Sequence, residues 1–88
     1  MTHETARPDD ALTAEILRLA SARGAARSIC PSEVARSLAP DAWRPLMGPV
    51  RLAAAALARQ GQLDILRKGK PIPPDALRGV IRLRIRES

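Results

Sequence analysis

Two alternating segments near the end of the sequence constrain the fold more than any other feature. They are "LDILRK" (63–68) and "VIRLRIR" (80–86), and each is typical of a β-strand with one apolar side. In the second segment the apolar side consists of Ile81, Leu83 and Ile85, and the opposite side consists of Arg82, Arg84 and Arg86. The two segments therefore predict a small antiparallel sheet whose apolar face is covered by helices.

The segment between the strands, "GKPIPPDALRG" (69–79), contains three prolines and has a glycine at each end. Because proline lacks a backbone N–H and stiffens the chain, we expect this wing to protrude without adding hydrogen bonds to the sheet. If Lys68 pairs with Val80, the register places four pairs of residues opposite one another. They are Leu63–Ile85 and Ile65–Leu83 facing the helices, and Asp64–Arg84 and Leu66–Arg82 on the outer face.

Two helices are expected in the first 40 residues of the chain. Asp9 and Asp10 can cap the first, which ends at Arg23-Gly24 and is followed by a connector (24–28) and a very short strand at Ser28-Ile29. The second helix lies in "CPSEVARSLAP" (30–40), with Pro31 at its first position and Pro40 at its end. Glu33 can reach back to the amide of Cys30, which is half of a capping box.

A third helix is expected to start near Pro49 and to run to Gln60, with Gly61 after it. The bent connector before it, "DAWRPLMGPV" (41–50), has room for a single turn of its own. The helical period predicts an open outer side on the third helix, made of Arg51, Ala55, Ala58 and Arg59.

The resulting order is helix, short strand, helix, helix, strand, wing, strand, which is the winged-helix arrangement. We therefore predict a mainly α fold with a small antiparallel β-sheet. It forms one domain over residues 9–88, behind a flexible N-terminal tail of residues 1–8.

The chain also resembles a small bacterial family of unknown function. The resemblance rests on four stretches in a fixed order: "ICPSEVARSL" (29–38), "WRPLMGPVRLAA" (43–54), "GQLDILRKGKP" (61–71) and "RGVIRLRI" (78–85). It implies a winged-helix-like domain, and it implies no activity, ligand or catalytic residue.

Charge is distributed unevenly along the chain, whose net charge is +6. Residues 1–42 carry five basic and six acidic side chains (net −1), whereas residues 43–88 carry ten basic and three acidic ones (net +7). A basic half favours a polyanionic partner, above all nucleic acid, and the alternative is a charge that only resists aggregation.

Duplex DNA is the partner that these cations favour. Arginine near the start of a groove-binding helix reads guanine, which suits Arg51 and its neighbour Arg44, while Arg59 is placed for a phosphate. The wing and the strands beside it add further backbone contacts, from Arg67, Lys68, Lys70, Arg78 and Arg82. The alternative is a protein-interaction module that uses the same surface to contact an acidic partner, with no nucleic-acid role.

Two single residues allow more than one interpretation. Cys30 at a helix N-terminus is either a reactive thiol or, as we favour, a half-buried cap residue. Trp43, the only aromatic residue, either stacks on a base or, as we favour, fills the gap between the second and third helices.

Other classes are not favoured. The sequence shows no catalytic triad, paired carboxylates or phosphate-binding glycine loop, so we expect no enzyme, cofactor or small-molecule substrate. His3 has no second His or Cys nearby, so no metal site is expected. The absence of a signal-peptide pattern and of a long apolar stretch, together with a single cysteine, predicts a cytoplasmic protein of bacterial type.

Overall fold

Helix α1 (Pro8–Arg23) begins with a proline, whose missing N–H has no partner in the first turn of a helix. The computed structural model describes residues 8–86 of the 88. Asp9 and Asp10 therefore lie inside the first turn of α1, and the prediction that they precede the helix as caps is wrong. The expected tail lies outside the described residues, apart from Pro8, which is helical.

Helix α2 (Pro31–Leu38) starts where the capping pattern predicted. The amide of Cys30 donates to Glu33 Oε2 at 2.9 Å, and Arg23 Nη2, at the end of α1, donates to Glu33 Oε1 at 2.6 Å. Burial acts to raise the pKa of Glu33, but the Cys30 amide and the Arg23 guanidinium outweigh it, so the pKa is lowered. One carboxylate thus caps α2 and attaches it to α1.

Helix α3 (Met47–Arg59) starts two residues before the predicted Pro49. The single turn foreseen in the connector is present as the 3₁₀ helix η1 (Arg44–Leu46), and it leads directly into α3. Pro49 falls on the third position of α3, where its N–H would have no partner within the helix.

The outer side of α3 differs from the prediction. Ala55 is only 3% exposed and belongs to the core, and Ala58 is half-buried against it. The exposed side is instead apolar and small, with Leu52 70% exposed between Pro49 and Ala56. Packing of the 3₁₀ helix η2 (Pro74–Ala76) and the residues after it against α3 covers the side that periodicity left open.

The sheet has the order β2-β1-β3 and is antiparallel throughout. Strands β1 (Leu63–Arg67) and β3 (Arg82–Ile85) pair in the predicted register, with Ile65 opposite Leu83 and Asp64 opposite Arg84. The very short strand expected near Ile29 is a single bridge to Leu83, closed by two backbone hydrogen bonds of 2.8 Å.

The wing corrects one prediction, because it does add a strand. Strand β2 (Lys70–Ile72) pairs with β1, so that Pro71 lies opposite Leu66. Lys68 and Gly69 form the turn with φ of 53° and 80°, the positive values that a two-residue hairpin turn requires. Pro71 removes one donor only, and a proline is tolerated in an edge strand.

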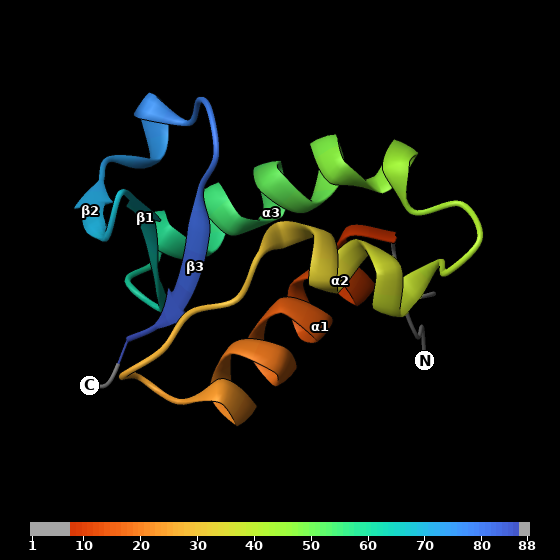
Figure 1. The fold of residues 1–88 in the computed structure, drawn as a ribbon, viewed down its shortest axis with the longest axis horizontal. Helices are drawn as coiled ribbons and strands as arrows, with labels where there is room; N and C mark the ends of the chain where they lie inside the picture. The colour runs from red at the N-terminus through yellow and green to blue at the C-terminus, as the bar shows by residue number, and fades with distance from the viewer. Residues whose placement is uncertain (1–7, 87–88) are drawn as a thin grey trace, which may run out of the picture.

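The core lies between the helices and the inner face of the sheet (Figure 1). It consists of aliphatic side chains and includes Ile16, Ile29, Val34, Val50, Leu57, Ile65 and Leu83, all at most 2% exposed. The described residues thus form a mainly helical fold with a small antiparallel sheet, compatible with the predicted winged helix. Figure 1 shows the sheet at the C-terminal end of α3 and α2 with η1 at the other end.

A polar contact between α1 and α2 predicts a dependence of stability on pH. Glu15 accepts hydrogen bonds from the guanidinium of Arg18 and from the hydroxyl of Ser37, which lower its pKa from 4.5 to about 2. Because the folded state favours the ionised form, this contribution is complete above about pH 4.5 and is lost as the pH falls toward 2.

Substitution Glu15→Gln is therefore expected to reduce the free energy of unfolding by about 1–2 kcal/mol at neutral pH, discounted because Arg18 is largely exposed to water. At about pH 2 the variant and the parent should be equally stable. Urea denaturation followed by circular dichroism at both pH values measures the difference. An equal deficit at both values would show that the pKa shift contributes nothing.

Candidate nucleic-acid interface

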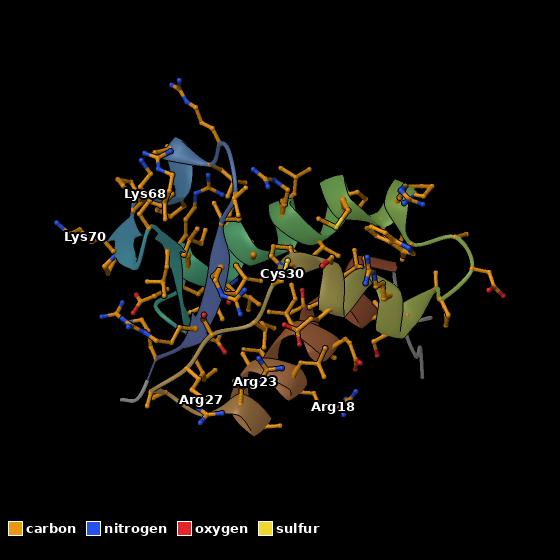
Figure 2. The ribbon with its side chains drawn as sticks, in the orientation of Figure 1. Arg18, Arg23, Arg27, Cys30, Lys68 and Lys70 are labelled. Carbon is orange, nitrogen blue, oxygen red and sulfur yellow. The ribbon has the colours of Figure 1, made fainter. Side chains whose placement is uncertain are left out.

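Three exposed cations of the wing region have no carboxylate partner. Lys68 lies in the β1–β2 turn, Lys70 begins β2, and Arg78 follows η2. Within residues 8–86 none of the three takes part in an ion pair. Figure 2 shows Lys68 and Lys70 together at the β1–β2 end, away from α1 and α2. This end of the molecule therefore presents positive charge that the fold does not neutralise.

Two further arginines at this end of the molecule donate hydrogen bonds to neighbouring segments of the chain. Arg67 Nη1 donates to the carbonyl of Arg78 at 3.4 Å, a long bond across the wing. Arg82 Nε donates to Ser28 Oγ at 2.7 Å and its Nη2 to the Ser28 carbonyl at 3.0 Å. The oxygens that these two guanidiniums contact are uncharged, and Arg82 also interacts electrostatically with Glu33. Both guanidiniums add to the positive potential while holding backbone in place.

The two arginines predicted on the groove-binding side of α3 are turned toward the wing. Arg51 is half-buried, and its Nη1 donates to the Gly79 carbonyl at 3.1 Å. Arg59 Nη2 forms an ion pair of 2.9 Å with Asp75 Oδ1, a side chain of η2. Sequence reasoning placed both residues on an open surface. The structure places them between α3 and the returning wing, so they connect the two.

Arg44 lies at the far end of α3, where it flanks Trp43. Its guanidinium carbon is 4.6 Å from the centroid of the indole ring, and that of Arg36, from α2, is 4.3 Å away. Trp43 is half-buried and packs against the core, as the gap-filling interpretation predicted. Sequence reasoning missed Arg36, because nothing in a sequence brings the last turn of α2 onto an indole across Pro40.

On the outer face of the sheet, the arginines farther from the wing are paired with a carboxylate. Arg84 Nη2 lies 3.0 Å from Asp64 Oδ2, the cross-strand pair that the register predicted, and Arg86 Nε lies 3.6 Å from Asp64 Oδ1. One carboxylate therefore faces two guanidiniums. On this face, within residues 8–86, the cations without an ion pair are those at the wing end.

Other candidate chemistry is sparse in the part of the chain that the structure describes. Cys30 is half-buried, its sulfur accepts a hydrogen bond from Ser32 Oγ at 3.0 Å, and it lines a hollow of about 200 Å³ with Arg51 and Val80. Residues 8–86 contain no cluster of side chains that could hold a metal ion. Over the same range, none of the helices is long and apolar enough to cross a membrane.

One exposed cation that sequence reasoning did not single out is Arg27, in the connector between α1 and Ile29. Figure 2 shows it with Arg18 and Arg23 along the α1 side of the molecule, on the opposite side from Lys68. Its distance from the wing makes it useful as a reference position for charge removal.

Comparison with protein families gives one result. The model of the family described as "Protein of unknown function (DUF3253)" matches residues 9–86. A comparison with curated proteins finds no match to this chain.

Proposed function

We propose that this chain, which belongs to the DUF3253 family, binds duplex DNA through the wing end of its sheet. The proposal is based on the geometry of the chain itself. The observation that carries the proposal is the group of unpaired cations, Lys68, Lys70 and Arg78, beside Arg67 and Arg82. Surface lysine and arginine without internal partners are suited to phosphate contacts, which supply most of the affinity of non-specific DNA binding.

The helix arginines have different roles in this proposal. Arg51 and Arg59 hold the wing against α3, and Arg44, in η1 before α3, offers a second contact to the sugar–phosphate backbone. The exposed side of α3 carries Leu52, Pro49 and Ala56, which offer apolar contacts and no charged reader of base edges. Binding is thus expected to depend weakly on sequence. A cytoplasmic, non-enzymatic role belongs to the same proposal.

A salt titration on a labelled random duplex tests the proposal. With about five phosphate contacts, the logarithm of the affinity should fall with the logarithm of the salt concentration at a slope of about −4 to −5. Fluorescence anisotropy measures it directly. Absence of binding at about 50 mM salt would refute duplex binding, because the electrostatic contribution is large there.

The single carboxylate of the wing gives a further prediction. Asp75 is 86% exposed and holds Arg59, so Asp75→Asn removes a negative charge from the basic end and releases a guanidinium. We expect duplex affinity to rise about two- to fivefold with little change in stability, since exposed ion pairs contribute little to folding. Anisotropy at fixed salt measures the rise. Asp41→Asn removes an exposed carboxylate outside the wing and serves as the control, and an equal gain in both variants would contradict a local effect.

A further inference from the structure

A hollow of about 530 Å³ opens on the outer face of the sheet at the wing end. Its lining includes Leu66 of β1, Val80 of the loop before β3, and three cations, Arg67, Lys68 and Arg82. The volume falls within the range of about 300–1,000 Å³ that binding pockets occupy. Most of the lining surface is apolar, and it includes Leu66, which the predicted register placed on this outer face.

The apolar lining is fixed by the backbone. Leu66 is only 6% exposed, yet it does not belong to the cluster of buried residues between the helices and the sheet. Val80 is 84% exposed, and the next residue, Ile81, is 2% exposed in the core. Because Ile81 is anchored inward, Val80 is held outward, so a large apolar side chain stays in water beside the hollow.

The charged side chains that line this hollow are all cationic, and Glu33, which is outside the lining, interacts electrostatically with Arg82. None of the eight residues that line the hollow is acidic. Asp64, on the same face of the sheet, is engaged with Arg84 and Arg86 further along the strands. Arg82 is already bonded to Ser28, so its guanidinium is positioned without a ligand. An apolar floor with a preformed cationic rim suits a ligand that is apolar in the middle and acidic at its ends.

We propose that this hollow binds an acidic peptide segment of a partner protein, with a large apolar side chain against Leu66 and Val80. Carboxylates on either side of that side chain pair with Lys68 and Arg82. Duplex DNA fits the hollow less well, because its outer surface is sugar and phosphate and would leave the apolar floor unused. The inference does not depend on duplex binding, since it rests on the apolar lining at Leu66 and Val80, although both proposals use the cations Arg67, Lys68 and Arg82.

The probe is a fluorescein-labelled hexapeptide with a leucine–phenylalanine pair between two pairs of glutamates. A matched peptide has two serines in place of the apolar pair. We expect the first peptide to bind at least fivefold more tightly than the second in anisotropy titrations of the full chain. In methyl NMR spectra it should shift the resonances of Leu66 and Val80 and leave those of Leu52 unchanged.

Two variants locate the site. Val80→Ser should reduce peptide binding at least fivefold while the fold is kept, because Val80 is almost fully exposed. Leu52→Ser, at the other strongly exposed aliphatic position, should leave binding unchanged. Lys68→Gln should reduce binding of both peptides.

Three results would overturn the inference: no binding of either peptide, equal binding of both, or an equal loss in both serine variants. Duplex titration of Val80→Ser separates this inference from the proposed function. That variant should bind duplex with the affinity of the parent protein. A failure of duplex binding would therefore leave the peptide inference standing, and a failure of peptide binding would leave the proposed function standing.

Discussion

Leu83→Ala is expected to reduce the free energy of unfolding by about 3–5 kcal/mol, the largest effect on stability of any change considered for this chain. Leu83 is fully buried, lies opposite Ile65 on β1, and bridges Ile29 through two backbone hydrogen bonds. The truncation opens a cavity where three segments meet. A domain of this size has about 5–10 kcal/mol of stability in total, so the variant should be close to unfolding at room temperature.

Urea denaturation followed by circular dichroism measures this loss. Leu52→Ala is the matched control, because it removes the same atoms from a side chain that is 70% exposed, and it should cost less than about 0.5 kcal/mol. A loss below about 1 kcal/mol for Leu83→Ala would mean that the bridge region is not part of the stable core.

The double substitution Lys68→Gln/Lys70→Gln should reduce duplex affinity about 10- to 50-fold at about 100 mM salt. Both side chains are exposed and without ion pairs in the described part of the chain, so their full charge is open to phosphates. Loss of two contacts should also make the salt slope shallower by about 1.8. Glutamine keeps a flexible polar side chain, one atom shorter than lysine, without its charge. Position 68 lies in the turn with φ of 53°, so the same polar residue is used at both positions.

The control for this experiment is Arg18→Gln/Arg27→Gln. It lowers the net charge by the same two units on the α1 side, which Figure 2 shows opposite Lys68 and Lys70. We expect less than a threefold change in affinity, because these cations lie on the other side of the molecule (Figure 2) and salt screens charges that are far from the bound duplex. Equal losses in the two double variants would indicate that the protein attracts DNA through its total charge and has no localised interface.

The sheet register could be predicted because local patterns determine it. Alternation in the two strands places Leu63, Ile65, Leu83 and Ile85 on one face, and the pairing of Asp64 with Arg84 on the other face agrees with it. The start of α2 was predictable for a similar reason, since Pro31 and Glu33 act within one turn. Interactions between near neighbours in the chain are visible in its sequence.

The path of the wing could not be predicted in this way. The three prolines indicated where donors are missing, yet the Lys68-Gly69 turn still allowed β2 to pair with β1. The return of residues 74–79 along α3 then covered Ala55 and engaged Arg51 and Arg59. Contacts between residues 16 to 28 positions apart have no periodic signature, so arginines that looked free in the sequence hold the wing in the structure.

The position of Trp43 between the guanidinium groups of Arg36 and Arg44 has a consequence for the fluorescence of the protein. With no tyrosine or phenylalanine in the chain, all near-ultraviolet absorption and emission of the side chains comes from this one indole. The two nearby guanidiniums make its emission sensitive to any change in their positions. A duplex that reached Arg44 would therefore alter the fluorescence of the unlabelled protein. A ligand bound only at the wing would leave the fluorescence of Trp43 unchanged. The emission spectrum of the protein therefore distinguishes the two modes of contact.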